Sequence, residues 1–155
     1  MKKAFTMIEL IFVIIIIGVL SAIALPILNA TRDDAKVSTI LANLKNTIND
    51  SAAFYSARGE KEWIKATVDK VTNVPIFKDE NCKKQATSTT TFVGNKLYMC
   101  NNNNSIIKLE ANKTHMLIKK GKSDSLIAKE VYKSKVFNSL NYKNGIRLGG
   151  LAVKR

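Results

Sequence analysis

The sequence has few of the residues from which catalytic and metal sites are built. Its 155 residues include one histidine, two cysteines and 12 acidic residues, which are spread thinly along the chain. A zinc site would lack ligands, because His115 stands alone and no C-x-x-C motif is present. No arrangement of serine, cysteine or histidine is typical of nucleophilic catalysis, and no acid follows Glu130, so the C-terminal part offers calcium no carboxylate ligands. We therefore expect a protein that is not an enzyme and that binds no metal and no cofactor.

Helix-breaking residues are also scarce near the N-terminus, where only Gly18 and Pro26 interrupt residues 5–57. Leu10 to Leu28 form an uncharged apolar run, which at about 1.5 Å per residue is close to the thickness of a bilayer core. One carboxylate, Glu9, lies at the leading edge of this run. An ionised group there costs roughly 3 kcal/mol unless it is paired, so we expect a partner for it, on another molecule.

The residues around Glu9 form a recognisable motif. Lys2 and Lys3 precede Ala4-Phe5, then Thr6-Met7-Ile8-Glu9, and the apolar run continues to Pro26. This pattern resembles the N-terminal signal of the type IV pilins and type II secretion pseudopilins. Ala4 stands where that family usually has glycine, and Met7 where leucine is commoner.

The resemblance implies that prepilin peptidase cuts between Ala4 and Phe5 and that Phe5 becomes an N-methylated terminus. Glu9 then becomes the fifth mature residue and Pro26 the twenty-second, the positions that these residues have in the family. The resemblance further implies that Glu9 meets the terminal amine of a neighbouring subunit during filament assembly, and that Pro26 bends the helix without ending it.

Two other interpretations of the N-terminus are simpler. Ala22-Ile23-Ala24 offers an A-x-A site for an ordinary secretory signal, with Lys2 and Lys3 as its basic region. An unprocessed single-span anchor, oriented by the same lysines, is the second alternative. Neither explains Glu9.

The following stretch has the apolar periodicity of an amphipathic helix. Its apolar face contains Val37, Leu41, Leu44, Ile48, Ala52 and Tyr55. We therefore divide the chain into a leader (1–4), a transmembrane and assembly helix (5–28), the amphipathic half of the same helix (29–57) and a periplasmic globular domain (58–155).

The globular domain begins where Arg58-Gly59 stops the long helix. The patterns predict a short helix over Glu60–Val71, a loop over Thr72–Asn81, strands over Thr89–Val93, Lys96–Cys100, Ser105–Ala111 and Thr114–Lys120, a helix from Ser123-Asp124 toward Leu140, and a last strand over Gly145–Val153. Gly149-Gly150 indicate a bulge or a close approach at a sheet edge. Trp63 is expected in the core. The predicted fold is α+β and pilin-like: a long N-terminal helix packed on a small antiparallel sheet.

Two further features concern covalent chemistry. Cys82 and Cys100 lie 18 positions apart, and in a domain facing the periplasm we expect a disulfide worth roughly 3 kcal/mol. A metal pair is the weaker alternative. Asn112-Lys113-Thr114 is an N-x-T acceptor, and Glu110 two residues before Asn112 resembles the extended bacterial glycosylation sequon.

The chain is strongly basic, with 21 lysines and 4 arginines giving a net charge of +13. Nucleic acid, an acidic membrane surface or an acidic secreted partner would each suit this charge. The lysines are separated into clusters, however, and together with 15 asparagines they are also typical of an AT-rich genome. Nucleic-acid contact therefore stays open.

We expect a structural subunit, a pilin or pseudopilin, of a helical filament in a type II secretion or type IV pilus-like machine. Its expected partners are itself, other pilin-like subunits, prepilin peptidase and an inner-membrane assembly platform. It would be a single-pass protein of the bacterial inner membrane, with its C-terminal domain in the periplasm or on the filament. The alternatives are a pseudopilin of a DNA-uptake apparatus whose basic domain contacts DNA, and a membrane-anchored domain that never polymerises.

Overall fold

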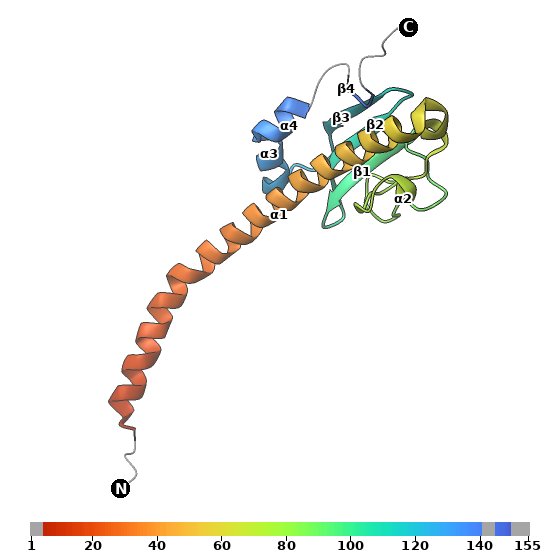
Figure 1. Ribbon diagram of the computed structural model, residues 1–155. Helices are drawn as coiled ribbons and strands as arrows, with labels where there is room; N and C mark the ends of the chain where they lie inside the picture. Colours follow the sequence, from red (N-terminus) through yellow and green to blue (C-terminus); the bar gives the residue numbers. More distant parts are fainter. Residues whose placement is uncertain (1–4, 141–144, 150–155) are drawn as a thin grey trace. The chain divides into compact units, whose positions relative to one another are not determined.

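The computed structural model describes residues 5–140 and 145–149. The chain divides into two compact units, Met1–Lys36 and Val37–Arg155. The described residues form these elements in order: α1 (Met7–Lys65), α2 (Val68–Val71), β1 (Lys96–Asn101), β2 (Asn104–Ala111), β3 (His115–Lys120), α3 (Leu126–Lys133), α4 (Lys135–Leu140) and β4 (Ile146–Arg147) (Figure 1). The predicted combination of one long N-terminal helix and a small antiparallel sheet is confirmed.

Helix α1 is continuous across position 26, and its one non-helical residue is Gly59. The predicted bend at Pro26 stays a prediction. At Gly59 the backbone has φ 75° and ψ 178°, a conformation that L side chains rarely adopt, so the predicted interruption at Arg58-Gly59 is confirmed. Helical structure then resumes and ends at Lys65, eight residues beyond the predicted end at Ala57.

The prediction of one continuous helix over Glu60–Val71 is wrong. The segment is divided between the end of α1 and the four-residue α2 because Thr67 is extended, with ψ 155°. Thr67 forms an antiparallel bridge with Thr91, and the Val68 amide donates to the Thr90 carbonyl at 2.8 Å. Pairing with a distant segment therefore replaces helical hydrogen bonds at this point.

The sheet has the order β1-β2-β3-β4, and every neighbouring pair is antiparallel. Leu97, Leu109 and Ile118 are aligned across the three longer strands and are buried. They join Leu44 and Ile48 of α1 in one hydrophobic core, and the second half of α1 lies across the sheet in Figure 1. The predicted packing of the amphipathic half against the sheet is confirmed.

The strand predicted over Thr89–Val93 is wrong. This segment forms only isolated bridges, from Thr91 to Thr67 and, in parallel, from Val93 to Ala111. Phe92 is fully buried and stacks on Trp63 with ring centroids 5.4 Å apart, and its amide donates to the Ala66 carbonyl at 3.2 Å. The segment thus covers the core beneath the end of α1. Trp63 is confirmed as a core residue.

The C-terminal part also differs in detail. The predicted helix toward Leu140 is two helices, because Ser134 is extended and caps both, accepting from the Phe137 amide through its hydroxyl. Of the predicted last strand, the described residues 145–149 contain Ile146–Arg147 as β4, paired with β3. Gly149 approaches the Tyr55 ring so closely that a Cβ there would overlap it, as predicted for a close approach. Gly150 and the residues after it lie outside the described residues.

Candidate functional site

The helix start contains a reciprocal pair of side chains. The Thr6 amide and hydroxyl both donate to Glu9 Oε2, at 3.0 and 2.8 Å, and the Glu9 amide lies 3.3 Å from the Thr6 hydroxyl oxygen, which accepts from it. The Leu10 amide donates to the Thr6 carbonyl. Thr6-Met7-Ile8-Glu9 is therefore a capping box, which satisfies amides that have no partner inside the helix.

This pair changes the expectation for Glu9. The apolar surroundings in the sequence predict a partner on another molecule, whereas the structure provides two hydrogen bonds from Thr6 within the same chain. The signal was readable, because threonine followed three residues later by glutamate is a known helix-start pattern. Thr6 supplies no positive charge, however, and within residues 5–140 and 145–149 no cation forms an ion pair with Glu9.

The segment after Glu9 is apolar on every side. Its large side chains from Leu10 to Leu28 are all between 42% and 64% exposed. Among the described residues, α1 is the one helix whose length and composition would allow it to cross a membrane, and its most apolar window has a mean hydropathy of 3.0. A contiguous apolar surface of this kind requires lipid or other apolar helices around it.

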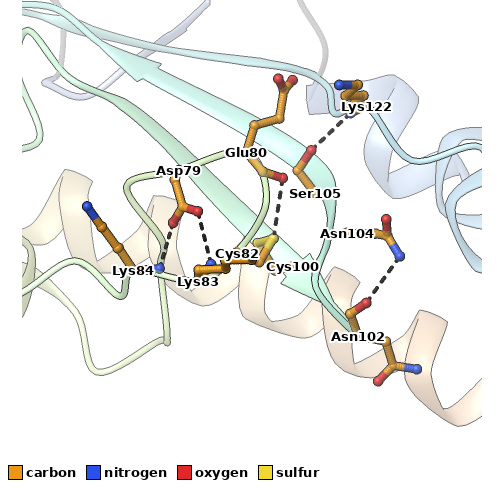
Figure 2. The surroundings of a disulfide bond; sticks show 10 residues. All are labelled: Asp79, Glu80, Cys82, Lys83, Lys84, Cys100, Asn102, Asn104, Ser105 and Lys122. Carbon is orange, nitrogen blue, oxygen red and sulfur yellow. Dashed lines mark hydrogen bonds between the residues drawn. A yellow bond between two sulfur atoms is a disulfide. The ribbon is translucent and has the colours of Figure 1, made fainter.

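A second candidate site is the disulfide between Cys82 and Cys100, which is formed, with Cα atoms 6.0 Å apart. The predicted pairing is thus confirmed. Figure 2 shows how the loop around Cys82 is held: the Asp79 carboxylate accepts from the amides of Lys83 and Lys84, at 3.0 and 2.7 Å. These two backbone donors hold the pKa of Asp79 below its usual value. Cys82 itself has φ 59°.

The same loop extends the sheet at its β1 edge. Phe77 and Tyr98 exchange two backbone hydrogen bonds of 2.8 Å. The disulfide joins the end of the loop to Cys100, also on β1. The edge strand is therefore covered on its open side, which limits pairing with other chains there.

The third candidate is Asn112, which is exposed in the turn between β2 and β3. Its side-chain oxygen accepts from the amides of Thr114 and His115, at 3.0 and 2.7 Å. Its carbonyl oxygen accepts from the Trp63 indole nitrogen at 2.9 Å, which anchors the turn to the core.

Near the end of α1 a hollow of about 490 Å³ opens between Phe54, Arg58, Glu62, Lys65, Ala66 and Lys70. Three cations thus face one carboxylate, and the Arg58 guanidinium lies 5.7 Å from the centre of the Phe54 ring. Local sequence patterns do not predict this group, because its residues come from both sides of the kink at Gly59.

The predicted site residues do not converge. Ala4 lies outside the described residues, Phe5 is 80% exposed, and Glu9 contacts Thr6. Cys82, Cys100 and Asn112 lie in the unit that contains the sheet. Within residues 5–140 and 145–149, no three histidine, cysteine, aspartate or glutamate side chains gather as a metal site would require.

The comparisons with known proteins identify the N-terminus. Residues 1–25 match the model of the prokaryotic N-terminal methylation motif, the signal of type IV pilin and pseudopilin precursors. No curated protein and no solved structure matches the chain.

Proposed function

We propose that this chain, which carries a prepilin-type methylation motif at residues 1–25, is a structural subunit of a filament in a type II secretion or type IV pilus-like machine. Prepilin peptidase would cut between Ala4 and Phe5, and Phe5 would be methylated. The observation that carries the proposal is the position of Glu9. Its carboxylate accepts two hydrogen bonds from Thr6 at the start of α1, directly before the segment Leu10–Leu28, which is apolar on every side.

Membrane storage and filament assembly place different demands on this carboxylate. In lipid, Thr6 satisfies part of its hydrogen-bonding capacity but supplies no positive charge to balance it. When apolar helices pack side by side, the free amine of a neighbour's Phe5 would supply the missing positive charge. Pairing with that amine in the assembled state would thus offset the desolvation cost that Glu9 carries in the membrane.

The orientation follows from charge. Lys2 and Lys3 precede the apolar run, and positively charged ends remain on the cytoplasmic side of a membrane. The unit Val37–Arg155 would then be exported to the far side of the inner membrane and would lie in the periplasm or on the filament. The proposed role is structural and not catalytic, with other pilin-like subunits and an assembly platform as partners.

Replacing Glu9 tests this proposal. We expect Glu9→Ala to be cleaved and membrane-bound at normal levels yet to form filaments at a tenth of the wild-type yield or less, because lateral packing is then without its charge pair. Filaments sheared from cells are measured against the membrane pool by immunoblot. Glu60→Ala removes an exposed carboxylate from the same helix and should leave the yield unchanged.

Two results would overturn the proposal. Glu9→Ala filaments of normal abundance would exclude the charge mechanism. A wild-type chain that keeps residues 1–4 and never forms filaments would instead indicate an anchored domain that does not polymerise.

A second candidate function is that of a subunit in a DNA-uptake apparatus. The observation that favours it is the hollow near the end of α1, which is lined by three cationic side chains. Arg58, Lys65 and Lys70 line it and are exposed, and none of the three belongs to an ion pair among the described residues. Phosphate groups bound there would release counterions, so affinity should fall steeply with salt.

A charge-matched pair of variants tests DNA contact. Full-length protein in non-ionic detergent is titrated with a labelled DNA oligonucleotide at several salt concentrations. We expect glutamine at Arg58, Lys65 and Lys70 to weaken binding at least tenfold and to lower the salt slope by about two to three. Glutamine at Lys83, Lys84 and Lys122 removes the same charge elsewhere. An equal loss in both variants would show diffuse attraction and would contradict a site at the hollow.

A further inference from the structure

The chain contains four asparagines in N-x-S/T motifs. They are Asn29-Ala30-Thr31, Asn49-Asp50-Ser51, Asn103-Asn104-Ser105 and Asn112-Lys113-Thr114. An acidic residue stands two positions before only one of these asparagines, Asn112. The motif alone occurs easily in a chain rich in asparagine, so the fold must decide which of the four an enzyme could reach.

In three of the motifs the side-chain hydroxyl of the serine or threonine is hydrogen-bonded to a backbone group. Thr31 and Ser51 lie inside α1 and donate to the carbonyls four residues before them, at 3.0 and 2.7 Å. Ser105 is 1% exposed, and its hydroxyl accepts from the Lys122 amide at 3.0 Å, as Figure 2 shows. A transferase that reads asparagine and hydroxyl together cannot bind these segments without unfolding a helix or displacing a strand.

The fourth motif is presented differently. Asn112 and Lys113 are exposed, Thr114 is half-buried, and the Thr114 hydroxyl contacts a side chain, His115 Nδ1, at 2.8 Å. The motif occupies the connection between β2 and β3 and not the body of a helix or strand. Only in this motif are the asparagine and its hydroxyl residue both accessible on a turn.

The hydrogen bonds of the turn also orient the asparagine side chain. Both protein donors approach Oδ1, from Thr114 and His115. The amide nitrogen on the other branch donates to no group in the described part of the chain. Because Oδ1 is fixed toward the turn and the residue is exposed, Nδ2 is left facing the solvent. The Trp63 contact to the Asn112 carbonyl holds this arrangement against the core.

We propose that Asn112 is the acceptor of an N-linked glycan. The donor class is an oligosaccharide joined through a diphosphate to a lipid. A bond forms between Nδ2 and the anomeric carbon, the bond from that carbon to the diphosphate breaks, and the lipid diphosphate leaves. One Nδ2 proton passes to a base of the transferase. The inference rests on the proposed export of this unit across the inner membrane.

Glu110 completes the recognition motif. Its carboxylate is three-quarters buried and contacts the ammonium groups of Lys108 and Lys119, at 2.7 and 2.5 Å. It therefore has a fixed position at the end of β2, on the approach to Asn112. We expect a transferase that requires an acid at this position to exchange one of these lysine contacts for its own cation.

The experiment uses the full chain in bacterial cells that carry a transferase specific for acid-x-Asn-x-Ser/Thr and its lipid-linked oligosaccharide. Intact mass and a tryptic map are recorded. We expect one glycan, on the peptide that contains Asn112, and none at Asn49 or Asn103. Asn112→Gln and Thr114→Val should lose at least nine-tenths of the glycan, Thr114→Ser should retain it, and Asn103→Gln should leave it unchanged.

The same map separates this inference from the proposed function. A chain that begins at Phe5 with unmodified Asn112 overturns the acceptor site and leaves the filament proposal standing. Glycan at Asn49 or Asn103 overturns it as well, because the structural selection would then have failed. Glycan at Asn112 on a chain that still begins at Met1 supports the acceptor site and counts against prepilin processing.

Discussion

At the scale of single residues, Glu110 forms two ion pairs within the sheet. Its carboxylate on β2 lies between Lys108 of the same strand and Lys119 of β3, and hydrogen bonds from these two ammonium groups lower its pKa to about 2. A lowered pKa means that the ionised form is favoured more strongly in the folded than in the unfolded chain. The resulting stability is present above about pH 4.5 and is lost as the pH falls toward 2.

Replacing Glu110 should therefore make the free energy of unfolding depend less on pH in the acidic range. Each pKa unit corresponds to about 1.4 kcal/mol, and screening at a partly exposed site reduces the total to roughly 1–2 kcal/mol. We expect Glu110→Gln to be less stable than wild type by that amount at pH 7 and nearly equal to it at pH 2. Urea unfolding at both pH values measures the difference. Parallel profiles for the two proteins would contradict the assignment.

At the scale of elements, the sequence pattern predicts where α1 starts, but it does not predict the path that the backbone of residues 86–95 takes. Thr6 and Glu9 have a spacing that predicts a helix cap, and Asn102 and Asn103 lie between two predicted strands, where the chain must turn. They form this turn with φ 47° and 60°, the pair of positive values that a two-residue hairpin turn requires.

Thr89 to Val93 has the composition of a strand yet forms only single bridges. Its place depends on the burial of Phe92 against Trp63, a contact between residues 29 positions apart. A local sequence pattern indicates the propensity of a segment to form a strand, but it does not predict a contact with a residue so distant in the chain. For the same reason the hollow around Arg58, Lys65 and Lys70 was not identified, while the disulfide followed from there being only two cysteines.

The helix cap makes a prediction of its own. Thr6→Val keeps the shape of the side chain but removes the hydroxyl that bonds Glu9. A lost cap costs about 1 kcal/mol, so hydrogen exchange of the amides from Met7 to Leu10 should accelerate about fivefold in detergent micelles. Thr6→Ser should exchange at the wild-type rate. Unchanged exchange in Thr6→Val would show that the hydroxyl does not support the helix start.

At the scale of the whole molecule, the division falls within α1 and not at its end. The compact unit that contains the sheet begins at Val37, whereas the sequence placed domain boundaries at 28/29 and 57/58. Leu44 and Ile48 belong to the same hydrophobic core as residues of the strands, so this part of α1 is an integral part of that unit.

We therefore expect residues 37–155 to fold without the apolar segment. Exported to the periplasm as a secreted fragment, this unit should be soluble and monomeric and should unfold cooperatively with its disulfide intact. Circular dichroism and thermal unfolding measure this directly. A fragment that begins at residue 58 lacks Leu44 and Ile48 and should fail to fold, because a core wall is missing. Equal behaviour of the two fragments would contradict the boundary.

The bridge between Cys82 and Cys100 has a mechanical consequence. It closes a loop of 18 positions, which corresponds to about 60 Å of fully extended chain. A subunit stretched from its two ends cannot release this length, because tension passes directly through the sulfur atoms and bypasses the loop. The hairpin strand that begins at Lys96 therefore keeps its anchor to the neighbouring loop even when the rest of the sheet has been pulled apart.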